Sequence, residues 1–132
     1  MKDEKVEDKP AIDFILECAR KYPNEVTLLS LAPLCNLQKA YEKDPESFSK
    51  LKRIVMMGGC YSYPYAEWNI RCDLEASKVV FSCPVETVAV GIDVTKDSPL
   101  TKEEIDEILS MKNEKPTKDQ MKILFYHSHR NR

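Results

Sequence analysis

The stretch that decides the fold is Lys52-Arg53-Ile54-Val55-Met56-Met57-Gly58-Gly59. Its apolar centre, residues 54–57, is typical of a strand buried on both faces, as in a parallel sheet flanked by helices. The two glycines that follow allow a sharp turn, and without Cβ atoms they let a ligand approach the main chain. Ligands of open α/β sheets bind outside the carboxyl ends of the strands, so we expect a binding site at this turn.

Polar residues follow the turn after a short aromatic loop, in the segment Ala66-Glu67-Trp68-Asn69-Ile70. If this segment is extended, Glu67 and Asn69 point the same way and offer a polyol paired acceptor and donor groups. A simpler interpretation is that the glycines only make a turn and that Glu67 faces water. The spacing alone favours the simpler interpretation.

Length and composition limit the chain to one hydrophobic core. It has 132 residues, of which 42% are hydrophobic, and a net charge of -2 with basic and acidic residues interspersed. This composition gives no reason to expect a nucleic acid or an anionic membrane as a partner. No apolar run approaches the roughly 20 residues that span a bilayer. Residues 1–9 are too charged for a secretory signal.

The cysteines indicate a reducing compartment. The chain has five, an odd number, and no pair has the Cys-x-x-Cys spacing of a zinc or redox site. We therefore predict that most are small core residues and that the protein is cytoplasmic.

Hydrophobic periodicity predicts alternating helices and strands. The first expected helix begins at Pro10, the second follows the segment 33–37 and has Leu37 on its apolar side, and two more begin at Pro45 and at the N-cap Asp73. The expected strands are 26–31, 54–57 and 87–92. Strands separated by helices indicate right-handed βαβ crossovers and a parallel sheet. The predicted fold class is therefore α/β, with the strand 87–92 ending at Asp93-Val94-Thr95.

The end of the chain has a different character. Thr101 and Glu104 form a capping-box pattern for a charged helix that runs to about Met111. A last helix is expected over residues 116–126. The predicted organisation is a charged leader over 1–9, one partial α/β domain over 10–126 and a basic tail over 127–132.

Several segments together resemble one known family. They are Glu25-Val26-Thr27-Leu28, Ala32-Pro33-Leu34-Cys35-Asn36-Leu37, Ile54-Val55-Met56-Met57-Gly58-Gly59, Ala66-Glu67-Trp68-Asn69-Ile70, Asp73 and Asp93-Val94-Thr95. In this order they are similar to the inosine-uridine-preferring nucleoside hydrolase family. The resemblance runs from about Ala11 to Thr101. It implies a Rossmann-like parallel sheet with alternating helices, here as an incomplete nucleoside hydrolase fold.

The resemblance also implies an activity and a site. The family hydrolyses the N-glycosidic bond of ribonucleosides to ribose and free base, in purine and pyrimidine nucleoside catabolism, with a bound Ca²⁺ that activates water. By position, Glu67 and Asn69 would bind ribose hydroxyls, and Met57 would lie against the sugar. Cys35 stands where the family commonly has a threonine whose backbone carbonyl binds the metal.

Two family motifs have no match in this sequence. One is the early Asp-x-Asp-x-x-x-Asp-Asp motif, which supplies the general base and most carboxylate ligands of the metal; Asp3 and Asp8 follow no strand. The other is a late His-Asp pair, since neither His127 nor His129 precedes an aspartate. We therefore expect idle tail histidines, no Ca²⁺ held by this chain alone, and no catalytic aspartate.

Two functional hypotheses remain. In the first, the chain is a truncated nucleoside hydrolase relative that recognises a ribonucleoside but is inactive in isolation. In the second, it is a non-catalytic binding or interaction protein that pairs through an exposed sheet edge, with a second copy or with a full-length relative. A Rossmann-type nucleotide binder ranks third because no Gly-x-Gly-x-x-Gly follows a strand.

Overall fold

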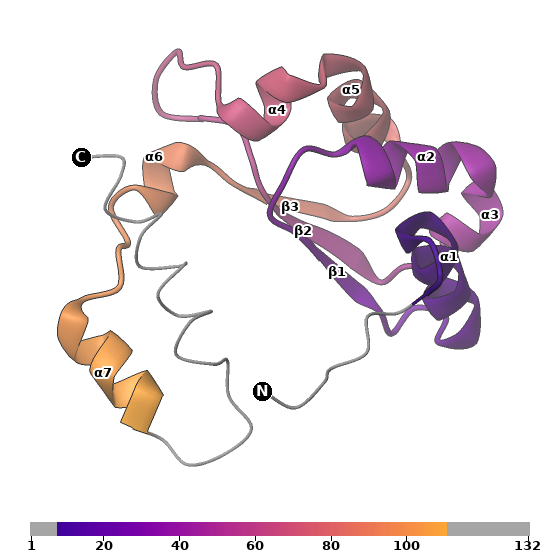
Figure 1. Cartoon of the computed structure of the whole chain (residues 1–132). Helices are drawn as coiled ribbons and strands as arrows, with labels where there is room; N and C mark the ends of the chain where they lie inside the picture. Colours follow the sequence, from indigo (N-terminus) through magenta and orange to yellow (C-terminus); the bar gives the residue numbers. More distant parts are fainter. Residues whose placement is uncertain (1–7, 111–132) are drawn as a thin grey trace. The chain divides into compact units, whose positions relative to one another are not determined.

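The structure of the protein is a computed structural model that describes residues 8–110. The chain forms two compact units, Met1–Val94 and Thr95–Arg132. Figure 1 shows the elements of both units along the chain. The expected last helix over 116–126 lies outside the described residues, as does most of the leader and all of the basic tail. The predicted division of the chain at residues 9 and 126 stays a prediction.

The first unit contains a parallel three-stranded sheet. Its strands are β1 (Thr27–Ser30), β2 (Arg53–Met57) and β3 (Thr87–Val90), and β2 is central. Both strand pairs are parallel, and their register places Leu29, Val55 and Val88 in one row. The predicted parallel α/β fold is confirmed.

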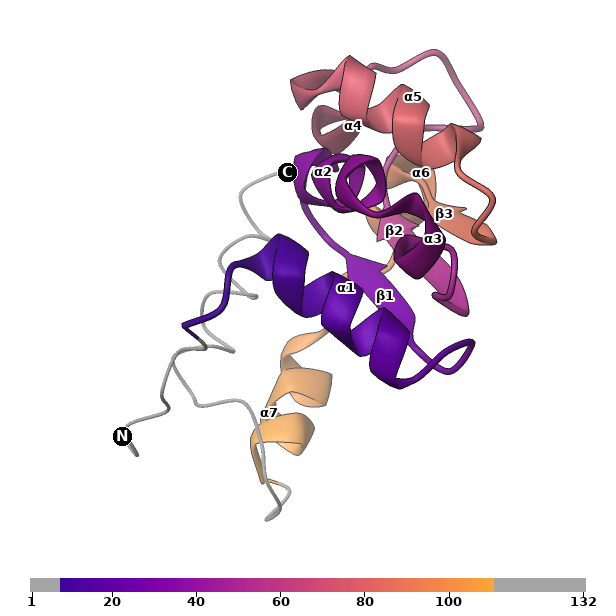
Figure 2. The ribbon, with the colours of Figure 1, turned by 90° about the vertical axis from the view of Figure 1, so that its right-hand side faces the viewer.

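Helices connect the strands and cover one face of the sheet. They are α1 (Ala11–Lys21), α2 (Cys35–Lys43), α3 (Pro45–Phe48), α4 (Trp68–Cys72) and α5 (Leu74–Ser82). Figures 1 and 2 show this helical layer from two directions. The short helix α6 (Ile92–Thr95) follows β3 and replaces the predicted end of the strand. The second unit contains α7 (Lys102–Ser110).

The two faces of the sheet have different environments. Ile54 and Met56 of β2 point into the core and are fully buried. The alternate row points outward, where Leu29 is 62% exposed and Val88 is 40% exposed. The prediction that β2 is buried on both faces is therefore wrong for the described residues, because their helical layer covers only one face.

Phe48 is one of the largest side chains of the core. It is fully buried, and its ring packs edge-to-face on Tyr41, with centroids 5.6 Å apart. The same cluster includes Leu16 of α1, Val80 of α5 and Met56 of β2. The core of the first unit is thus one cluster that joins residues of the sheet to residues of the helical layer.

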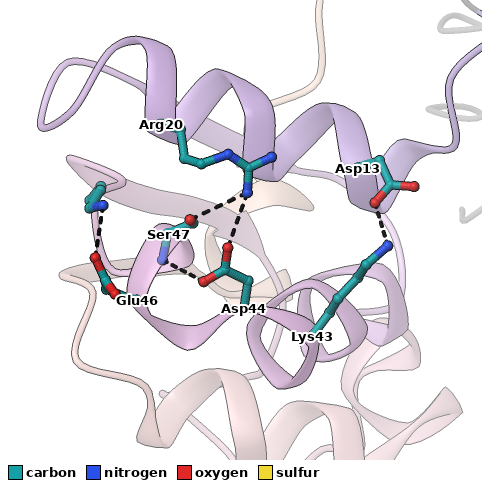
Figure 3. A network of polar contacts seen from close by, with 7 residues as sticks. Asp13, Arg20, Lys43, Asp44, Glu46 and Ser47 are labelled. Carbon is teal, nitrogen blue, oxygen red and sulfur yellow. Dashed lines mark hydrogen bonds and ion pairs between the residues drawn. The ribbon is translucent and has the colours of Figure 1, made fainter.

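A polar network fixes α3 against α1 (Figure 3). Asp44 is the N-cap of α3, and its Oδ1 accepts a hydrogen bond of 3.0 Å from the backbone N–H of Ser47. The guanidinium of Arg20 donates to Asp44 Oδ2 at 3.0 Å and to Ser47 Oγ at 3.3 Å. The hydrogen bonds from Ser47, assisted by Arg20, hold the pKa of Asp44 below its ordinary value. An ion pair between Lys43 and Asp13 also joins α2 to α1.

The predicted helix caps are present. Asp73 Oδ1 accepts from Ala76 N at 2.9 Å at the start of α5. At the start of α7, Glu104 N donates to Thr101 Oγ1 at 3.2 Å and Thr101 N donates to Glu104 Oε2 at 2.8 Å. None of the helices within residues 8–110 is both long and apolar enough to cross a membrane.

We expect Phe48→Ala to lower the free energy of unfolding by about 3–5 kcal/mol, because it opens a cavity in the core. Urea unfolding followed by circular dichroism measures the change. Phe14, which is 47% exposed on α1, provides the control: Phe14→Ala should change stability by no more than about 0.5 kcal/mol. Equal effects of the two substitutions would contradict the placement of Phe48.

Candidate functional site

The turn after β2 is fixed by hydrogen bonds to the segment after β3. Gly58 N donates to Val90 O at 3.0 Å, and Ile92 N donates to Gly59 O at 2.9 Å. Gly59 has a φ of +82°, a backbone conformation that residues with a side chain rarely adopt. The predicted turn is present, and it joins the carboxyl ends of two neighbouring strands.

Glu67 is buried beneath this turn. Only 3% of the residue is exposed, so the simpler sequence interpretation, a solvent-facing Glu67, is wrong. Its carboxylate is the N-cap of α4 and accepts from the N–H groups of Asn69 at 2.9 Å and Ile70 at 3.1 Å. It also accepts from Gly59 N at 3.1 Å. Glu67 therefore connects the glycine turn to the first turn of α4.

Asn69 contacts Met57 rather than extending beside Glu67. The residue is 9% exposed and lies in α4, so the condition of an extended segment is not met. Its Nδ2 donates to Met57 O at 3.0 Å and lies 3.4 Å from Met57 Sδ. The structure thus brings Met57, Glu67 and Asn69, the three residues that the family resemblance names, together at the carboxyl end of the central strand.

Cys35 lies at the first position of α2, and its thiol donates to Pro33 O at 3.9 Å. In the described part of the chain, no hydrogen bond joins Cys35 to Met57, Glu67 or Asn69. Within residues 8–110, no group of three or more His, Cys, Asp or Glu side chains is placed to hold a metal ion. The tail histidines lie outside the described residues.

The aromatic loop after Gly59 is anchored by Asp93. Oδ2 of Asp93 accepts from Tyr61 N at 3.2 Å, from Ser62 N at 2.9 Å and from Ser62 Oγ at 2.6 Å. These hydrogen bonds, led by that of the Ser62 hydroxyl, hold the pKa of Asp93 below its ordinary value. Asp93 Oδ1 is buried without a hydrogen-bond partner in this part of the structure.

No local pattern in the sequence predicted this anchoring role for Asp93. The residue was expected at the end of the third strand and in one of the segments that resemble the family. Its position just after β3 was the available signal, because loops at the carboxyl ends of adjacent parallel strands lie side by side.

Tyr61 completes the contacts of the loop with the glycine turn. Its hydroxyl donates to Gly58 O at 3.3 Å. Burial, together with the charges of Asp93 and Glu67, raises the pKa of the phenol. The hydroxyl therefore stays protonated and remains a donor at neutral pH.

The whole chain, residues 1–132, matches the family model described as inosine-uridine preferring nucleoside hydrolase. The chain belongs to this family. It is 36% identical over 110 residues to the probable uridine nucleosidase 2 of Arabidopsis thaliana, a match that covers 80% of this chain and 34% of the relative. It is 38% identical over 98 residues to the non-specific ribonucleoside hydrolase RihC of Escherichia coli, covering 71% of this chain and 32% of that protein.

Solved structures of the family have the same fold. A plant nucleoside hydrolase superposes with a TM-score of 0.71 at 30% identity, over 97% of this chain and 40% of that chain. The purine-preferring ribonucleoside hydrolase from Gardnerella vaginalis superposes with a TM-score of 0.77 at 26% identity, over 98% of this chain and 43% of that chain. This member of the nucleoside hydrolase family thus spans about a third of the length of the curated relatives it matches.

Replacing Glu67 by glutamine should lower the free energy of unfolding by about 1–3 kcal/mol. A glutamine side chain has one acceptor oxygen, so it leaves at least one of three buried N–H donors without a partner. Urea denaturation measures the loss. The exposed Glu75 of α5 is the matched control, and Glu75→Gln should stay within about 0.5 kcal/mol of the parent. An unchanged midpoint for Glu67→Gln would show that its carboxylate is not a structural acceptor.

The anchoring of the aromatic loop should depend on pH. Because the folded-state pKa of Asp93 lies below its ordinary value of 3.8, its stabilising effect is complete well above pH 3.8. The effect is lost as the pH falls through the lower folded-state value. The backbone NMR signals of Tyr61 and Ser62 report this change.

Asp93→Asn should weaken the same anchoring already at neutral pH, because it removes the charge. Asp106→Asn, at an exposed position of α7, serves as the control and should leave the Tyr61 and Ser62 signals unchanged. Equal spectra for Asp93→Asn and the parent would contradict the anchor.

Proposed function

We propose that this chain carries the ribose-recognition part of a nucleoside hydrolase, whose reaction splits the N-glycosidic bond of a ribonucleoside into ribose and free base. The supporting observation is the cluster of Met57, Glu67 and Asn69 at the carboxyl end of β2, in a chain that belongs to this family. Named relatives act on uridine or on ribonucleosides generally.

The cluster retains groups suited to a sugar. Asn69 Nδ2 is occupied by Met57 O, whereas Asn69 Oδ1 has no hydrogen bond within the described residues and is not a buried unpartnered atom. That oxygen can accept a hydrogen bond from a ribose hydroxyl. Glu67 acts by holding the turn and α4 in place, and Met57 provides an apolar surface beside Asn69.

The described residues do not fit the calcium ion that the family implies. Calcium takes about six to eight oxygen ligands, several of them carboxylates. No suitable group of side chains exists within residues 8–110, and Cys35 offers a thiol, which is a soft donor. We therefore derive no step through a metal and propose that this chain in isolation does not hydrolyse nucleosides.

A cytoplasmic location is part of the same proposal. All five cysteines lie within the described residues and are unpaired. Free thiols are typical of proteins kept in a reducing compartment.

The test combines binding and activity. We expect the purified chain to bind ribose, seen as a saturable shift of the Gly58 backbone amide signal in NMR, and to release no base from uridine or inosine with or without Ca²⁺. Asn69→Ala should weaken ribose binding about two- to tenfold through loss of one hydrogen bond. Gln38→Ala, which removes a side-chain amide from α2, is the matched control and should leave ribose binding unchanged.

Two results would overturn this proposal separately. Calcium-dependent release of base would show that the isolated chain is active. Ribose binding that is absent, or equal in Asn69→Ala and the parent, would remove the ribose-recognition role.

A second candidate function is pairing through the sheet edge. Within the described residues, β1 and β3 each pair with β2 alone, so each has one open edge. Such edges are templates for another strand. We expect light scattering after size exclusion to show a fraction of dimer that rises with protein concentration, or a complex with a full-length relative. A monomer throughout, with no such complex, would exclude this function.

A further inference from the structure

A cavity of about 410 Å³ lies within the first unit, lined by the aromatic loop and by α4 and α5. Its size falls in the range of small-molecule sites, about 300–1,000 Å³. The residues that decide its character are Tyr61, Tyr65, Ile70, Arg71, Leu74 and Phe81. Gly59 and Glu67 also line it, whereas Met57, Asn69 and Cys35 do not. The cavity therefore adjoins the proposed ribose contacts of Met57 and Asn69 without including them.

The cavity offers rings and aliphatic surface to a ligand. The side chains of Tyr61, Tyr65 and Phe81 are all substantially exposed, although each is large and mainly apolar. Leu74 and Phe81 are seven residues apart on α5, so they lie on one face of that helix, and both line the cavity. Aromatic groups around a hollow suit a flat, unsaturated molecule, because its rings can pack on theirs in stacked or edge-to-face contacts.

The cavity also has a positive charge without an opposite partner. The guanidinium of Arg71 lies 5.1 Å from the centroid of the Trp68 ring, which holds it by a cation–π contact. No ion pair engages Arg71 among the described residues. The nearby carboxylate of Glu67 already accepts three backbone N–H groups.

We propose that this cavity binds a planar aromatic molecule that carries a carboxylate. The rings of the loop and of Phe81 cover the flat part of the ligand, and Arg71 pairs with its charge. A guanidinium suits this role because its fork of N–H donors matches a carboxylate.

The experiment titrates the full chain with 2-naphthoate and, as the neutral analogue, 2-naphthamide. Trp68 is the only tryptophan of the chain, so its indole N–H gives a single NMR signal beside Arg71. We expect 2-naphthoate to saturate this signal with a Kd of about 1 mM, as is usual for a ligand of this size. The amide should bind about threefold or more weakly, the effect of one exposed ion pair.

Three variants separate the two parts of the site. Phe81→Ala should weaken both ligands about two- to tenfold through loss of one ring contact. Arg71→Gln should weaken only 2-naphthoate, making its affinity equal to that of the amide. Lys78→Gln is the control, because Lys78 is a mostly exposed cation of α5 that does not line the cavity; neither affinity should change.

Each contrary outcome overturns the proposal. No saturation by 2-naphthoate up to about 10 mM would exclude the site. Equal affinities for the two ligands, or no effect of Arg71→Gln, would exclude an anionic ligand. Displacement of 2-naphthoate by uridine would assign the cavity to the nucleoside instead. Ribose binding through Asn69 is measured on a different signal, so failure of either proposal leaves the other test intact.

Discussion

Glu67 is the one charged residue buried among those described, and the site is built on it. A carboxylate is stable away from water only when hydrogen bonds replace its hydration. The donors here are two N–H groups that the start of α4 leaves unpaired and one from Gly59. The carboxylate therefore stabilises the helix start and the turn together. Met57 and Asn69 meet because this one group fixes both of the segments that carry them.

Much of the fold follows from local patterns in the sequence. The apolar run before Gly58, the N-cap at Asp73 and the reciprocal pair Thr101 and Glu104 each depend on neighbours within a few residues, and all three are present in the structure. Alternation of strands and helices was enough to predict the parallel sheet. The proximity of Met57 to Asn69 was predictable because Met57 ends the central strand and Asn69 lies in the segment that follows it.

The rest depends on contacts between distant segments. The spacing of Glu67 and Asn69 suits an extended segment, whereas Glu67 is the buried N-cap of a helix. That helix has five residues, which is too short for hydrophobic periodicity to reveal it. Asp93 anchors a loop about thirty residues earlier in the chain, which no local pattern encodes. The burial of β2 was overestimated because an apolar strand does not reveal how many of its faces are covered.

The outward row of the sheet, Leu29, Val55 and Val88, has a consequence for the behaviour of the chain in solution. Removing apolar area from water gains about 25 cal/mol per Å². Any protein segment that covers this row therefore gains binding free energy in proportion to the apolar area it buries, and it needs no specific polar contacts. A lysine at Val55 would improve colloidal stability and would also repel such a layer. The same three apolar side chains thus lower the solubility of the chain and favour its assembly into a larger α/β structure.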